Sequence, residues 1–189
     1  RLALSNVSGT LFGGRVTGLT ELRNDQGTGL LSAQFELEEV PLLKLLPESG
    51  LSGSANVNAT VSATGKSVNA LVVSLSGSGS ATLKDIAISG LNPQAFKLLL
   101  EKADELGPEV DASHIEAFAP AIIRSGKFEA GSAELAFTVA NGVARFPPLQ
   151  LANEGARMSV EGSANFRDRS VSASGSLTFE PGIDAVAGA

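Results

Sequence analysis

Apolar and polar residues alternate along most of the chain, and the longest such stretch covers residues 51–64. Leu, Gly, Ala and Val fill its odd positions, while Ser, Asn and Thr fill its even positions. Alternation with a period of two predicts a β-strand with one apolar and one solvated face. Its 14 residues rise about 3.3 Å each and span roughly 46 Å, whereas an ordinary strand has about 5–6 residues. A strand of this length does not fit a small β-sandwich.

The same alternation recurs through the rest of the chain. It is strong in residues 29–38, 155–166 and 170–180, and weaker in residues 1–7, 11–22, 74–88, 127–139 and 143–151. Short polar links separate several of these stretches, at residues 24–27, 141–142, 153–155 and 167–169. Links this short join antiparallel neighbours. We therefore expect an antiparallel meander of roughly nine strands that is apolar on one face.

Three segments break the alternation: residues 41–47, 66–73 and 91–125. The first two predict short turns or helices. In the third, Asn92 is a candidate N-cap with Pro93 at the first helical position, and Gly107 followed by Pro108 ends the helix. Apolar residues recur between them at helical spacing, namely Phe96, Leu99, Leu100, Ala103 and Leu106.

A second helix follows, with Asp111 or Ser113 as its cap and Pro120 inside it. Its apolar face comprises Ile115, Phe118, Ala119 and Ile122. An internal proline predicts a kink or an early end. We expect residues 91–125 to form a helical hairpin inserted in the sheet. The hairpin either caps one end of a groove or docks a partner or a membrane, and its apolar stripe and weakly basic surface favour capping.

The apolar face of so many long strands is larger than two helices can cover. The sheet must therefore close on itself or curl into a trough. A closed barrel needs bulkier inward side chains than the Ala, Gly and Ser found here. We expect a mainly β fold, with residues 1–189 forming one domain: a long, curved antiparallel sheet, shaped like a taco or groove, with the inserted helical hairpin.

Composition and charge argue against several classes of protein function. The chain has 189 residues, and 14 Lys and Arg against 20 Asp and Glu give a formal net charge of −6. This acidic balance argues against a nucleic-acid partner. The lack of cysteine excludes disulfides and thiolate metal sites, and no apolar run reaches the roughly 18 residues of a membrane-spanning helix. Because the sequence begins at Arg1 without a signal peptide, we expect a fragment or a processed product.

No group of residues predicts catalysis. His114 is the single histidine, and a general base needs partners placed around it, so we expect a surface or capping role. The glycine-rich residues 76–80 lack the Lys and the helix of a phosphate-binding loop, and residues 11–14 predict a bend or bulge. Glycines in the apolar rows either open space for a ligand or let the strand bend. We expect no enzyme activity, no catalytic residue, no metal and no cofactor.

A trough lined by small apolar groups suits flexible alkyl chains, which bind through buried area rather than through directed polar contacts. The predicted lining consists of the larger residues in the apolar rows. These are Leu31, Phe35, Leu37, Val57, Val61, Leu83, Leu135, Phe137, Val139, Met158, Val160, Leu177 and Phe179.

Two motifs resemble the C-terminal region of AsmA-like proteins. Residues 4–14, LSNVSGTLFGG, are followed by Val-Thr-Gly at residues 16–18, and residues 75–86, LSGSGSATLKDI, are followed by Gly-Leu-Asn at residues 90–92. Both mix glycine bends with strand alternation in the way that is typical of this family. Ile86 departs from the pattern, because the family often has glycine after the aspartate.

The resemblance implies a relative of the bridge-like lipid transfer proteins, with an apolar groove in a long β-sheet. Such proteins reside in the bacterial periplasm, are held in the inner membrane by an N-terminal helix, and are implicated in phospholipid movement to the outer membrane and in envelope integrity. For this chain the resemblance implies phospholipid acyl chains as ligand, envelope proteins at the groove ends, and an anchor outside the chain. The alternative is a structural or assembly-assisting β-protein without lipid, which acts in outer-membrane protein biogenesis by adding a client strand to a free sheet edge.

Overall fold

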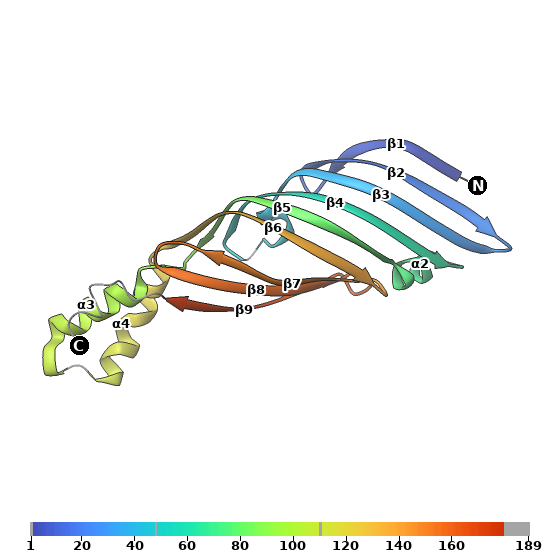
Figure 1. Ribbon diagram of the computed structural model, residues 1–189. Coiled ribbons are helices and arrows are strands. Elements are labelled where there is room, and N and C mark those ends of the chain that lie inside the picture. The colour runs from blue at the N-terminus through green and yellow to red at the C-terminus, as the bar shows by residue number, and fades with distance from the viewer. Residues whose placement is uncertain (1, 48, 110, 180–189) are drawn as a thin grey trace.

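The computed structural model describes residues 2–47, 49–109 and 111–179. Nine antiparallel strands form one sheet, and their order in the sheet is their order in the sequence (Figure 1). The strands are β1 (Leu2–Leu11), β2 (Gly14–Asp25), β3 (Thr28–Pro41), β4 (Leu51–Gly65), β5 (Ser76–Ser89), β6 (Lys127–Ala140), β7 (Val143–Ala152), β8 (Ala156–Asn165) and β9 (Ser170–Phe179). β1 and β9 do not pair, so the sheet is open. The predicted open meander is confirmed, while Arg1 and Glu180, at the ends of two predicted strands, lie outside the described residues.

The helices lie where the alternation breaks. Two are short: α1 (Leu42–Leu45), between β3 and β4, and α2 (Val68–Ser74), between β4 and β5. The hairpin between β5 and β6 consists of α3 (Ala95–Leu106), the 3-10 turn Gly107–Glu109 and α4 (Ala112–Arg124). The sequence therefore located each helical segment correctly.

Three hairpins turn through two residues that both have positive φ. The first residues are Phe12, Gln26 and Asn141, with φ of 52°, 48° and 53°, and a glycine follows each of them. This is the geometry of turns that match the twist of paired strands. Residues 11–14 therefore form the turn between β1 and β2, so the predicted bend within one strand is wrong. The first position of such turns is usually Asn or Asp. Because Phe12 occupies it here, the sequence pattern did not predict this turn.

Bulges bend the strands near the end from which the helical hairpin leaves. The pairing shifts between Leu37 and Val40 in β3, between Leu83 and Ile86 in β5, and between Phe146 and Leu149 in β7. The extra residues include Glu39, with φ of 55°, and Asp85, with φ of 53°. A bulge bends its strand and increases its twist. The sheet therefore curls most strongly at the hairpin end.

The sheet divides into two walls along the β6–β7 boundary. Among the described residues these strands pair only beside their turn, at Thr138–Arg145, Val139–Ala144 and Ala140–Val143. β7, β8 and β9 fold beneath β5 and β6 (Figure 1). The two walls meet in a hydrophobic core at the hairpin end, formed by Leu42, Ala55, Ile86, Phe128, Leu151 and Ala156.

The hairpin differs from the prediction at its start. Gln94, not Asn92, is the N-cap of α3. Asn92 is instead buried; its Oδ1 accepts from the Gln94 N–H at 2.9 Å and its Nδ2 donates to the Ile122 carbonyl at 3.3 Å. The side chain thus links the start of α3 to the end of α4. Asp111 caps α4, as predicted, whereas the predicted early end at Pro120 is wrong because α4 continues to Arg124.

α3 and α4 pack chiefly on each other and extend away from the sheet (Figure 1). Their base touches the β7–β8 turn, where a Cβ added at Gly155 would lie 2.6 Å from the Pro93 carbonyl oxygen. Phe96, Leu100 and Ile115 are exposed. In the described part of the hairpin, contact with the end of the sheet is therefore made chiefly at the base, and α3 and α4 project away from the sheet (Figure 1).

Candidate functional site

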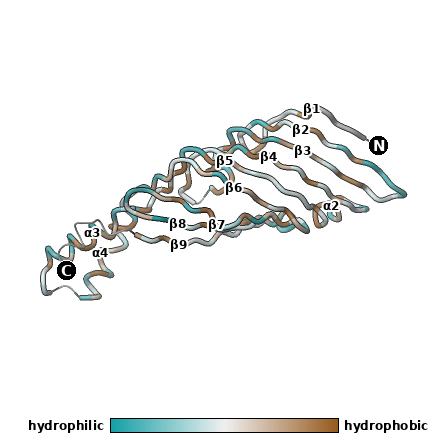
Figure 2. Tube along the Cα trace, viewed as in Figure 1, coloured by the Kyte–Doolittle hydropathy of each residue, from teal (hydrophilic) through white to brown (hydrophobic). Residues whose placement is uncertain are grey.

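One face of the sheet is apolar across its whole width. The pairing register joins Val16, Leu37, Val57, Ala81 and Leu135 into one row across β2 to β6. Residues on the intervening positions point to the opposite face, and apolar and polar positions alternate along the strands in Figure 2. We call the surface formed by these rows the apolar face.

All thirteen predicted lining residues belong to the apolar face. The register links those of β3 to β6 directly, and the pairing of Val139 with Ala144 continues the face into β7, β8 and β9. They are Leu31, Phe35 and Leu37 in β3, Val57 and Val61 in β4, Leu83 in β5, Leu135, Phe137 and Val139 in β6, Met158 and Val160 in β8, and Leu177 and Phe179 in β9.

The apolar face is concave, because the two walls fold towards each other (Figure 1) and residues of this face from both walls meet in the core. In the middle of the sheet small residues of β4 are buried, for example Val61, which is 8% exposed, and α2 packs on the same strand. Leu31 and Phe35 on the neighbouring strand are half-buried, and Leu22, one strand further out, is exposed. Exposure therefore rises from the floor to the rim, and we call this concave surface the trough.

The floor of the trough is uncharged. Between β2 and β5 its rows contain Val, Leu, Ile, Phe, Ala, Gly, Thr and, at the turn, Asn24, with no ionisable side chain. Ionisable residues of these strands lie on the opposite face or at bulges, including the pair Arg15–Glu38 with an N–O distance of 3.3 Å. An uncharged ligand could therefore lie along the floor without meeting a charge.

Two glycines of the trough are covered by phenylalanine rings from neighbouring strands. A Cβ added at Gly162 in β8 would lie 2.5 Å from Cζ of Phe146 in β7, and Phe137 in β6 covers Gly79 in β5 in the same way. Of the two roles that the sequence left open for such glycines, neither fits these two positions. They provide space for a ring of the protein itself, which shields the glycine backbone.

The trough is filled at the hairpin end. Five of the predicted lining residues pack against the core where the two walls meet, namely Val57, Leu83, Met158, Leu177 and Phe179. Within that core Phe128 is fully buried. These five side chains thus pack where the two walls meet, and the trough is open only further from the hairpin.

The sequence missed part of the second wall. Phe146, Leu149 and Leu151 of β7 lie on the apolar face, paired with Gly162, Val160 and Met158. A bulge containing Pro147 and Pro148 separates Phe146 from Leu149, so apolar residues three apart share one face. The proline pair is the signal that indicates this break in alternation.

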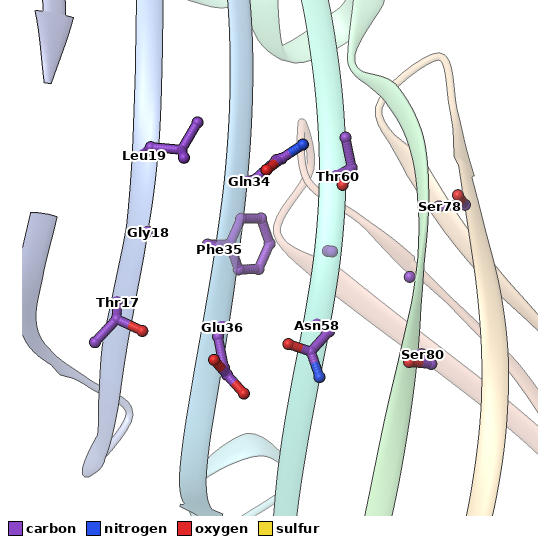
Figure 3. A pocket seen from close by; sticks show the side chains of 12 residues that line it. Thr17, Gly18, Leu19, Gln34, Phe35, Glu36, Asn58, Thr60, Ser78 and Ser80 are labelled. Atoms are coloured by element: carbon purple, nitrogen blue, oxygen red, sulfur yellow. The ribbon is translucent and has the colours of Figure 1, made fainter. Parts of the chain in front are cut away.

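The opposite face carries a hollow of about 520 Å³ across β2 to β5. Figure 3 shows its side chains in two rows, and the register places Thr17, Glu36, Asn58 and Ser80 in one and Leu19, Gln34, Thr60 and Ser78 in the other. The backbones between the rows form its floor. Two further hollows lie between β7, β8 and β9. None of the buried side-chain polar atoms described lacks a hydrogen-bond partner.

His114 lies at the start of α4 and is exposed. Its Nδ1 is 2.9 Å from Oδ1 of Asp111, which also accepts from the Ser113 hydroxyl at 2.7 Å and from the His114 N–H at 3.0 Å. These hydrogen bonds, with that from Ser113 foremost, lower the pKa of Asp111 to about 2. The arrangement is a helix cap. In the described part of the chain no three acidic or histidine side chains cluster in a way that could hold a metal ion.

No helix within the described ranges is both long and apolar enough to cross a membrane. The sequence matches no protein-family model and no curated protein, and the structure matches no solved structure.

Proposed function

We propose that this chain is a lipid-binding module that holds phospholipid acyl chains in the trough. The observation that carries the proposal is the trough itself: a concave, uncharged apolar surface that runs across an open sheet. Exposed apolar surface of this extent in a folded protein usually marks an interaction site. Alkyl chains suit it because they gain about 25 cal/mol for each Å² of apolar surface removed from water and need no directed polar contact.

The wider setting of the proposal follows from the resemblance to AsmA-like proteins. In this setting the chain is a periplasmic part of a protein held in the inner membrane by a helix outside it. It contributes to phospholipid transfer to the outer membrane and to envelope integrity, with envelope proteins at the ends of the groove. The chain acts as a binding surface rather than as an enzyme, and its thirteen lining residues have no catalytic role.

Two neighbouring residues of β3 give a matched test. Ala33 is half-buried in the trough, between Leu31 and Phe35, and Gln34 is exposed on the opposite face. Ala33→Asp introduces a carboxylate where an acyl chain would lie, which costs free energy because the charge finds no partner there. Gln34→Asp makes the same change in the same strand but faces water. Native mass spectrometry and lipid extraction, after purification without detergent, measure the bound lipid.

We expect phospholipid in the parent and in Gln34→Asp, and a large loss in Ala33→Asp. Circular dichroism checks that both variants are folded. A folded parent that carries no lipid would contradict the proposal. So would a folded Ala33→Asp variant that retains as much lipid as the parent.

The open edges of the sheet favour a second candidate function, in the assembly of outer-membrane β-proteins. β1 and β9 each pair with one described strand, so each offers its other side to a further strand. Unpaired edges of this kind accept strands from other chains. A strand-forming peptide derived from an outer-membrane protein should then bind the lipid-free protein. If isothermal titration detects no binding, this candidate is wrong.

A further inference from the structure

The trough consists of two parts that differ in packing. In β9 the exposed fraction is 56% at Val171, while Leu177 and Phe179 are half-buried against the core. In β3, Leu31 and Phe35 are not among the residues that form this core or pack against it. The walls therefore meet at the hairpin end and separate towards the β2–β3 and β8–β9 turns, which lie at the other end in Figure 1.

The packed part contains no space for an acyl chain. Ile86 and Phe128 from one wall and Ala156 from the other are 2% exposed or less. Three bulges curl the strands at this level, so the contact between the walls follows from the backbone. A ligand chain could enter here only by displacing the core.

The open part has a defined length. It begins near Gly29 and Gly65, where α2 packs on the apolar face and Leu71 lies 3.9 Å from the position of a Cβ on Gly29. It ends near the pair Leu37–Val57, beyond which the core begins. From Leu31 to Leu37 the strand rises about 20 Å. Acyl chains of one membrane leaflet extend about 15 Å, half of the hydrocarbon thickness of a bilayer.

We propose that acyl chains occupy only the open part of the trough, and that the core at the hairpin end is a fixed stop. This inference rests on the proposed function and narrows it. The occupant is an alkyl chain because the rows of the open part carry no ionisable side chain and are apolar apart from Thr20, which pairs with Ala33. A phospholipid then enters and leaves the open part without passing through to the hairpin.

The chain has no Trp and no Tyr, so a single introduced tryptophan is its only strong fluorophore. Phe35→Trp places it in the open part, and Phe179→Trp places it against the core; both positions are half-buried phenylalanines of the apolar face. Phe96→Trp reports on the exposed surface of α3. Each protein is loaded with phosphatidylglycerol and phosphatidylethanolamine brominated on the acyl chains, because bromine quenches tryptophan at contact. Unbrominated lipid is the reference.

We expect Phe35→Trp to lose most of its fluorescence, while Phe179→Trp and Phe96→Trp keep theirs. Equal quenching at positions 35 and 179 would overturn the fixed stop but agree with the proposed function. Lipid binding without quenching at position 35 would overturn the inference. Equal quenching at positions 35 and 96 would also overturn it, because the lipid would then be spread over the surface of the protein. No bound lipid at all would overturn the proposed function. If Phe35→Trp does not fold, Leu31→Trp serves the same purpose.

Discussion

Single residues determine how the apolar rows are filled. Gly162 and Gly79 lack side chains, and the rings of Phe146 and Phe137 occupy the space beside them. An aromatic ring over a cross-strand glycine removes backbone from water and restores the packing that the glycine lacks. Each pair therefore acts as a unit, and neither member can be changed independently.

A double-mutant cycle tests this coupling. Gly162→Ala should destabilise the protein by about 1–3 kcal/mol, because the new Cβ collides with the ring of Phe146. Phe146→Ala should cost about 2 kcal/mol, below the usual cost for a fully buried Phe because this ring is half-buried. The double variant should lose less than the sum, with a coupling of about 0.5–3 kcal/mol. Urea unfolding measures all three free energies, and simple additivity would contradict the pairing.

The alternation of residues was sufficient to assign side chains to faces, because a strand repeats every two residues regardless of its neighbours. It could not predict which residues lie beside each other on different strands. That depends on the register, and the turns at Phe12–Gly13 and Asn141–Gly142 set the register for two of the hairpins. The role of Gly162 was therefore hidden, since it depends on a phenylalanine of another strand.

Among the elements, the helical hairpin depends on Asn92. Its Nδ2 donates to the Ser125 hydroxyl at 3.2 Å as well as to the Ile122 carbonyl. Its Oδ1 accepts a hydrogen bond from the Gln94 N–H. Asn92→Ala should destabilise the protein by about 1–3 kcal/mol, because buried groups lose their partners. Gln94→Ala, at an exposed neighbour, is the control and should change the urea midpoint little. Equal shifts would show that Asn92 has no special role.

The start of α4 should respond to pH. The pKa of Asp111 is lowered to about 2 in the folded protein and returns to about 3.9 in the unfolded chain. The cap therefore stabilises the fold fully above about pH 4, and the contribution is lost as pH falls through about 2. A carboxyl ¹³C NMR titration should give a midpoint near 2 for Asp111. Ser113→Ala should raise it towards 3.8, and an unchanged midpoint would contradict the assigned cause.

At the scale of the whole molecule, the shape of the trough follows from where the strands bend. Long one-sided strands require a curved sheet, so the open meander was predictable from the alternation. The meeting of the walls was not, because it depends on the bulges at Glu39, at Asp85 and at Pro147–Pro148. A bulge at Glu39 or Asp85 leaves little trace in a hydrophobic pattern, and only the proline pair marks its bulge in the sequence. The sequence therefore predicted one continuous lining, whereas the structure divides it into an open and a packed part.

The division predicts that the helical hairpin is dispensable for lipid binding. α3 and α4 pack chiefly on each other and leave the sheet at the packed end, far from the open part. The Gly90 N–H donates to the Gly126 carbonyl at 2.9 Å, so a two-residue Asn-Gly turn can replace residues 93–124. The shortened protein should lose about 1–3 kcal/mol with the contacts of Asn92 and retain its lipid, as measured by urea unfolding and lipid extraction. A folded deletion variant that loses its lipid would show instead that the hairpin belongs to the binding site.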